Sequence, residues 1–172
     1  MKRGMAAVAM TAILCGSMSA QDTSPIVCER IVEAPLDAAW QAWTTSDGLR
    51  SWLAPHTEID LRVGGRMRTN YRLQGALGDP QTIENTVLSF DPKRMISIKV
   101  AKAPDGFPFP NVIHDMWTVI YFEAAGPDRT KVRIVGLGFR PDEESQRMRA
   151  FFDRGNATTL EQLQRHLSRE RR

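Results

Sequence analysis

The 172-residue sequence predicts an α+β domain in which an antiparallel sheet of about six to seven strands packs against one long C-terminal helix. Three observations predict this class. Apolar and polar residues alternate between positions 59 and 139, glycine- and proline-containing turns divide that stretch into hairpins, and helical spacing takes over at residues 142–169. The length suits a single domain with a sizeable core.

Residues 1–20 have the three-part layout of a secretory signal peptide. Lys2 and Arg3 precede an apolar run over residues 5–14, and small residues follow. This run is short for crossing a bilayer. We therefore expect cleavage after residue 19 or 20, a mature domain of residues 21–172, and a periplasmic or secreted protein without stable membrane insertion.

Two alternatives to cleavage stay open. A lipoprotein acylated at Cys15 is less favoured, because the large residue Leu14 stands where a small one is required, and an uncleaved N-terminal anchor is the other alternative. Cleavage would leave Cys28 as the one cysteine, without an intramolecular disulfide. It would also remove Lys2 and Arg3 and lower the net charge from +3 to +1, which argues against a nucleic-acid partner.

The first elements are a strand and two short helices. Residues 25–33 are rich in β-branched side chains, which predicts a strand that contains Cys28 as a small buried side chain. A short helix over residues 37–45 begins beside Pro35, and a second covers residues 47–53.

Strands then follow one another through hairpins. Ile59 and Leu61 alternate with charged residues, and Gly64-Gly65 predicts a two-residue turn with positive φ at both positions. The clearest alternating strand follows it, over residues 67–73. Separated by turn residues, the further predicted strands cover residues 82–90, 95–101, 114–123 and 130–138. The segment 102–112 contains three prolines and cannot pair as a central strand.

The helix over residues 142–169 has its own start and stop signals. Acidic residues occupy its first turn and arginines its end, as the helix dipole favours. One apolar face is formed by Met148, Phe151, Phe152, Leu160, Leu163 and Leu167. In the middle, large side chains give way to Gly155, Asn156, Ala157 and Thr158, which we call the helix notch. We expect the helix notch to form the wall of a cavity between helix and sheet.

This order of elements resembles the START and birch-pollen-allergen-like (SRPBCC) superfamily, and within it the activator of heat-shock protein 90 ATPase-like domain. The resemblance covers about residues 25–168 and is carried by IVEAPLDAAWQAWT (31–44), LRSWLAP (49–55), DLRVGGRMR (60–68), VLSFDPKRM (87–95) and TKVRIVGLGF (130–139). It implies a helix-grip fold, a curved antiparallel sheet wrapped around the long helix with a hydrophobic cavity between them. Because the chaperone of that name is cytosolic, a cleaved leader would separate this chain from it.

The resemblance and the strand alternation together predict which side chains line the cavity. The expected lining consists of Trp52, Met67, Tyr71, Met116, Ile120, Phe122, Met148, Phe152 and Asn156. Methionines and aromatic rings suit an apolar or flat ligand, since thioethers adapt their shape and rings bury large areas. The alternative is that the same residues fill the core and leave no usable void.

Possible polar groups of the cavity are His56, Asn85 and His114. The histidines lack the spacing of metal ligands, so neither a metal nor a cofactor is expected. The sequence also contains no nucleophile elbow, phosphate-binding glycine loop or dinucleotide fingerprint, which argues against an enzyme.

We therefore expect a secreted or periplasmic protein that binds a small hydrophobic molecule without changing it, with residues 102–112 as a mobile flap over the mouth of the cavity. A cavity enzyme, such as a cyclase, hydrolase or dehydratase acting on an apolar substrate, is the first alternative. A protein-interaction or chaperone-related module is the second, and its mark would be an exposed apolar patch around Trp117 and Tyr121.

Overall fold

The computed structural model describes residues 22–170, so the predicted signal peptide lies outside the described residues. The strands are β1 (Ile26–Val32), β2 (His56–Ile59), β3 (Arg66–Asn70), β4 (Ile83–Asp91), β5 (Met95–Lys102), β6 (Trp117–Gly126) and β7 (Arg129–Leu137). The helices are α1 (Leu36–Thr44), α2 (Ser46–Trp52) and α3 (Glu143–Glu170). Among the described residues, no helix is long and apolar enough to cross a membrane.

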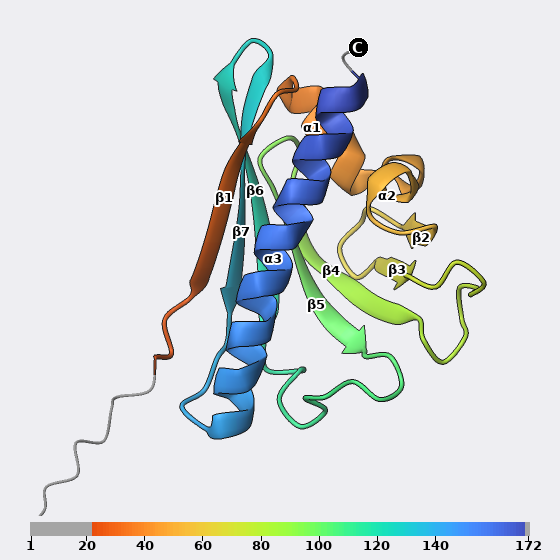
Figure 1. Cartoon of the computed structure of the whole chain (residues 1–172), viewed down its shortest axis with the longest axis vertical. Helices are drawn as coiled ribbons and strands as arrows, with labels where there is room; N and C mark the ends of the chain where they lie inside the picture. Colours follow the sequence, from red (N-terminus) through yellow and green to blue (C-terminus); the bar gives the residue numbers. More distant parts are fainter. Residues whose placement is uncertain (1–21, 171–172) are drawn as a thin grey trace, which may run out of the picture.

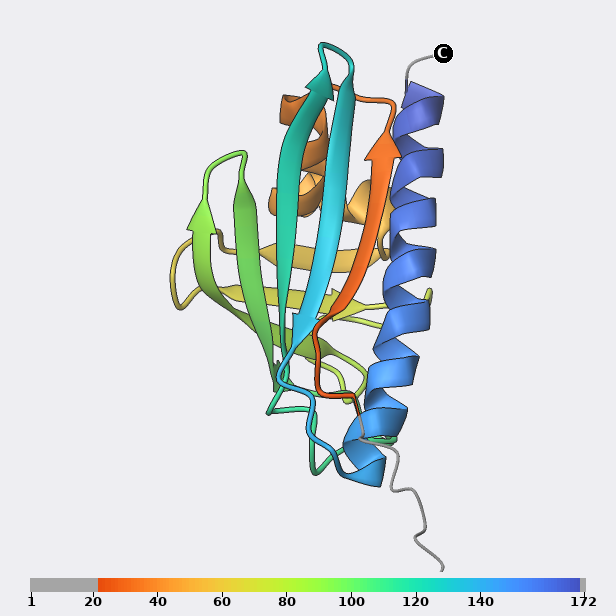
Figure 2. The same cartoon turned by 90° about the vertical axis from the view of Figure 1, so that its left-hand side faces the viewer.

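The seven strands form one antiparallel sheet in the order β1-β7-β6-β5-β4-β3-β2. Strands β2 to β7 are neighbours in the sequence and in the sheet, as consecutive hairpins require, and β1 pairs with β7. The sheet curls strongly, so that β2 and β3 run across the direction of β6 and β7 (Figure 2). The predicted α+β class, with a curved sheet around a long helix and two short helices after the first strand, is confirmed.

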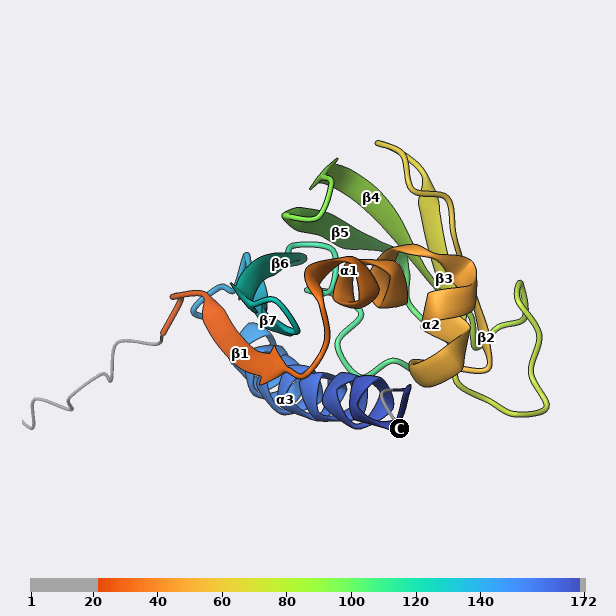
Figure 3. The same cartoon turned by 90° about the horizontal axis from the view of Figure 1, so that it is seen from above.

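The two short helices are separate because the backbone is extended at Thr45, with φ −118° and ψ 150°. The Thr45 hydroxyl caps α2 by accepting a hydrogen bond from the backbone N–H of Gly48 at 3.0 Å. Gly48 also permits a close approach of the helices, since a Cβ there would lie 2.3 Å from the carbonyl oxygen of Gln41. This junction places α1 beneath the sheet and brings α2 beside α3 (Figure 3).

Helix α3 runs along one side of the molecule, next to β1 (Figure 1). Asp142 caps it, because its Oδ1 accepts a hydrogen bond from the backbone N–H of Ser145 at 3.0 Å. Toward its C-terminal end, the fully buried residues Leu160, Leu163 and Leu167 join the main hydrophobic core. Met148, near the N-terminal end, belongs to a second hydrophobic cluster. The helix is therefore packed at both ends, and the helix notch lies between the two packed regions.

Two predicted strands differ from the observed ones in their boundaries. Strand β3 ends at Asn70 instead of residue 73, because the fully buried Asn70 amide bonds the Ala76 carbonyl and the Asp79 carboxylate and turns the chain. Strand β6 begins at Trp117 instead of residue 114. Residues 109–115 form turns there, with hydrogen bonds from the Ile113 N–H to the Phe109 carbonyl and from the Asp115 N–H to the Val112 carbonyl.

The predicted Gly64-Gly65 turn is also corrected. Only Gly64 has a positive φ, at 77°, and the turn bond runs from the Gly65 N–H to the Arg62 carbonyl, so Val63 and Gly64 are the central residues. Gly65 is required for a different reason: a Cβ there would lie 2.1 Å from the Asp60 carbonyl oxygen. Leu61 lies beyond β2, which ends at Ile59.

Candidate ligand pocket

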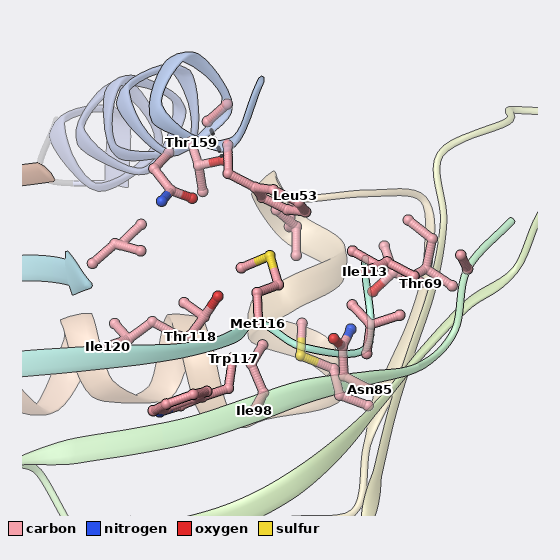
Figure 4. A pocket seen from close by; sticks show the side chains of 18 of the residues that line it. Leu53, Thr69, Asn85, Ile98, Ile113, Met116, Trp117, Thr118, Ile120 and Thr159 are labelled. Carbon is pink, nitrogen blue, oxygen red and sulfur yellow. Dashed lines mark hydrogen bonds between the residues drawn. The ribbon is translucent and has the colours of Figure 1, made fainter. Parts of the chain in front are cut away.

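A pocket of about 460 Å³ lies between the helix notch and the concave face of the sheet (Figure 4). Its walls come from α1, from β3 to β7, from the segment 103–116 and from α3. The lining is predominantly aliphatic, aromatic and thioether, as in Ile98, Ile113 and Met116. This volume lies within the range of about 300–1,000 Å³ that is typical of small-molecule sites.

The helix notch leaves the space that becomes the pocket. Gly155 and Asn156 line it together with Thr159, one turn further along α3. A Cβ added to Gly155 would meet no atom within 4 Å, so nothing packs against the helix at this point. Of the helix notch, Gly155 and Asn156 therefore border a cavity as predicted, whereas Ala157 and Thr158 are exposed and do not line it.

Many of the predicted cavity residues lie on this pocket. They are Met67, Tyr71, Met116, Ile120, Phe152 and Asn156, together with the polar candidate Asn85. Tyr71 lines the pocket although it follows the end of β3, and 56% of the residue is exposed. That these residues contact a ligand remains a prediction.

Three predicted wall residues lie elsewhere. Phe122 is buried against Trp40, with ring centroids 5.3 Å apart, and Met148 is fully buried in the second cluster. Trp52 packs edge-on against Trp43 and donates from Nε1 to the Ala42 carbonyl at 2.9 Å. Trp43 occupies the pocket wall in its place. Alternation assigned the correct face of the sheet to Phe122, but this part of the face is filled by α1.

The two histidine candidates also lie outside the pocket lining. His56 Nε2 lies 3.3 Å from the Leu73 carbonyl oxygen, and His114 Nδ1 lies 3.1 Å from that of Val100. Both rings are therefore within hydrogen-bonding distance of backbone carbonyl groups. Residues 22–170 contain no group of three or more His, Cys, Asp or Glu side chains that could hold a metal ion.

Sequence reasoning missed the aliphatic wall on β5, and it placed the proline-rich segment over the mouth of the cavity without assigning any of its rings to the lining. Ile98 and Val100 line the pocket, and their alternation with polar neighbours was a usable signal. Phe107 lines it as well. Only the folded chain shows this, because the segment 102–112 has no periodicity that would orient its rings.

Four phenylalanines attach the proline-rich segment to α3. The Phe107 ring lies 5.6 Å from Phe109 and 6.0 Å from Phe151, and Phe151 lies 5.4 Å from Phe152, all near perpendicular. Phe109 is buried in the second cluster, whereas Phe107 is half-buried at the pocket. The mobility of this flap stays a prediction.

The lining is uncharged. Among the described residues, no Asp, Glu, Lys, Arg or His lines the pocket, and Tyr71 is the one titratable group that does. Desolvation raises the pKa of the Tyr71 phenol from its ordinary value near 10, so the phenol stays protonated near neutral pH although the residue as a whole is 56% exposed. Three polar atoms of lining residues are buried without a hydrogen-bond partner: Trp43 Nε1, Thr69 Oγ1 and Asn156 Nδ2.

Asp79 organises the loop that follows Tyr71. Its carboxylate accepts hydrogen bonds from the backbone N–H of Ala76 at 3.1 Å, from that of Gln81 at 2.8 Å and from the Asn70 amide at 2.8 Å. The Ala76 bond is the largest cause that lowers the pKa of Asp79 below its usual 3.8, followed by the bond from Gln81. The charged form therefore supports the folded loop.

We expect the stability contributed by Asp79 to be lost at acid pH. Because the folded-state pKa is lowered, the contribution is present above the unfolded-state value near 4 and disappears as pH falls through the folded-state value. Asp79→Asn should thus lower the melting temperature at pH 7, and its difference from the wild type should shrink as the pH falls below about 4. Thermal unfolding across this pH range checks it, with Asp105→Asn on the neighbouring exposed loop as the control. If the melting temperature of Asp79→Asn is lower than that of the wild type by the same amount at every pH, the proposed role of the charge is wrong.

Comparison with known proteins supports the architecture. A sequence model of the family described as "Activator of Hsp90 ATPase homolog 1-like protein" matches residues 33–168. Among solved structures, a protein from Mesorhizobium loti is 21% identical with a TM-score of 0.65, over 85% of this chain and 98% of its own. The Aha1 dimer from Colwellia psychrerythraea is 18% identical with a TM-score of 0.63, over 84% of this chain and 96% of its own. CalU16 from Micromonospora echinospora is 22% identical with a TM-score of 0.60, over 87% of this chain and 83% of its own. At these identities the structures show the fold, and the curated proteins contain no match.

Proposed function

Because the chain belongs to the Activator of Hsp90 ATPase homolog 1-like family of the SRPBCC superfamily, whose domains typically bind small ligands, we propose that it binds a small hydrophobic molecule without changing it chemically. The observation that carries this proposal is the uncharged, largely apolar pocket of about 460 Å³ beneath the helix notch. A pocket of this kind gains affinity by removing apolar ligand surface from water.

The lining favours binding over catalysis. General acid–base chemistry needs a titratable group tuned toward the working pH, and usually a second group to complement it. Among the described lining residues only Tyr71 titrates, and burial raises its pKa away from neutrality. The phenol is thus suited to donating a hydrogen bond to a ligand.

A protein-interaction role finds less support on the sheet surface. The expected patch needed Trp117 and Tyr121 to be exposed together. Trp117 is instead half-buried and lines the pocket, and the Tyr121 ring lies beneath the Arg133 guanidinium at 4.7 Å.

We also propose that the protein acts in the periplasm or outside the cell. The support for this is the signal-peptide pattern of residues 1–20, which lies outside the described residues. Sequencing the N-terminus of the mature protein checks it. A mature chain that still begins at Met1 in the soluble cytoplasmic fraction would contradict export.

Binding is tested by thermal-shift and native mass-spectrometric screening of residues 21–172 against neutral lipids, sterols and flat aromatic compounds. A ligand present at a hundred times its Kd should stabilise the fold by about 2.7 kcal/mol. For a chain of this size, that raises the melting temperature by roughly 5–10 °C. If no compound shifts the melting temperature and none survives as a complex in the gas phase, the binding proposal is wrong.

A further inference from the structure

Two asparagine side chains on different walls distinguish this pocket from a purely apolar hole. Asn85 lies on β4, opposite Met67 in β3 and Val100 in β5, so its neighbours across the sheet are apolar. Its side chain lines the pocket and has no hydrogen-bond partner among the described residues. An amide in such surroundings retains one acceptor and two donor hydrogens for whatever enters.

Asn156 faces the same space from α3. Its Nδ2 is buried and has no hydrogen-bond partner. Helix α3 and strand β4 lie on opposite sides of the molecule in Figure 3. In Figure 4, Asn85 lies on the sheet side of the pocket and Thr159, one turn from Asn156, on the helix side. The two amides are therefore presented from opposing walls.

The physical cost of leaving these amides unpaired selects the ligand. A hydrocarbon in the pocket would strip the hydration of Asn85 without replacing it, which costs about 1–3 kcal/mol for a buried polar group, and it would leave Asn156 Nδ2 unpaired. A carboxylate or an amine would be desolvated without a counter-ion, since no charged side chain among the described residues lines the pocket. Neutral oxygen atoms avoid both penalties.

Building on the proposed binding function, we infer that the ligand is an uncharged apolar molecule with a hydroxyl or carbonyl oxygen toward each end, one bonded by Asn85 and the other by Asn156. The apolar body of the molecule lies against Ile98, Ile113 and Met116. The asparagines thus determine specificity, whereas the aliphatic and thioether wall supplies most of the affinity.

Three probes with the same flat body test this inference: naphthalene, 2,6-dihydroxynaphthalene and naphthalene-2,6-dicarboxylate. Dissociation constants come from ligand-observed NMR titrations at pH 7 with residues 21–172. We expect the diol to bind at least about tenfold more tightly than naphthalene, and the dicarboxylate to bind more weakly than either. Asn85→Leu and Asn156→Leu should each reduce the preference for the diol over naphthalene by about five- to tenfold.

The controls separate the two proposals. Gln74→Leu removes an exposed amide outside the pocket lining and should leave the preference unchanged. Asn156 is half-buried in an otherwise largely exposed stretch of α3, so its replacement tests the inference even if Asn85→Leu fails to fold. Circular dichroism shows whether each variant is folded. Equal affinities for the three probes, or an unaltered preference in Asn156→Leu, would overturn the inference while leaving apolar binding intact. If no probe binds and the wider screen is also negative, the binding function itself fails.

Discussion

Replacing Gly155 with tryptophan should abolish most ligand binding while leaving the protein folded. The Cβ of the new residue meets no atom within 4 Å, and the indole then occupies the space between the helix notch and the sheet. Forcing a ligand in beside it costs about 1–3 kcal/mol of overpacking, which corresponds to roughly a 5- to 150-fold loss of affinity. Stability should not fall, because glycine is a poor residue for a helix interior.

Ala150→Trp is the matched control for this variant, since it adds the same side chain to the exposed side of the same helix. Titration of 2,6-dihydroxynaphthalene, or of the most stabilising compound from the screen, into the wild type and the two variants measures the change in affinity. Thermal unfolding confirms that each is folded. Equal affinity in Gly155→Trp and Ala150→Trp would show that the ligand binds away from the helix notch.

Phe122→Ala should destabilise the protein by about 4 kcal/mol, because a buried aromatic ring is removed from a well-packed site. Phe122 is 5% exposed, and its ring meets that of Trp40 edge-on at 5.3 Å. A ring on a cavity wall would cost less to remove, because one of its sides already lacks packing partners. The size of the loss in unfolding free energy therefore distinguishes a core position from the wall position that the sequence predicted.

Denaturant unfolding of Phe122→Ala measures this free energy directly, and a lowering of the melting temperature by roughly 8–16 °C should accompany it. Leu73→Ala is the control, since Leu73 is 80% exposed and its truncation should change stability by no more than about 0.5 kcal/mol. A loss below about 2 kcal/mol in Phe122→Ala would mean that the ring is not part of a close-packed core.

Local rules account for the parts of the fold that the sequence predicted. Each of these parts depends on neighbours close in the chain. Examples are the acids that begin α3, the extended Thr45 between the two short helices, and the alternation along β5 and β7. At β3, where the predicted boundary was wrong, a contact outside the strand decided it. Asn70 ends β3 because its amide reaches the loop at Ala76 and Asp79, which no period within the strand reveals.

The same division applies to the pocket. Alternation identifies which face of a strand is apolar, and the helix notch indicates where the long helix is thin, so Met67, Ile120 and Asn156 were predictable from sequence. Alternation does not state how far away the opposite wall lies. Phe122 and Met148 face the interior yet are buried in the two clusters at the ends of α3.

The sequence by itself determined the order of the elements, the strand faces and the small residues in the middle of α3, because these follow from backbone geometry within a few residues. Only the tertiary structure decided that the helix is packed at both ends and leaves a hollow between them. The same arrangement presents Asn85 and Asn156, which are 71 positions apart in the chain, from opposite walls of one uncharged space. The spacing between α3 and the sheet depends on contacts among residues far apart in sequence, and no local pattern encodes it.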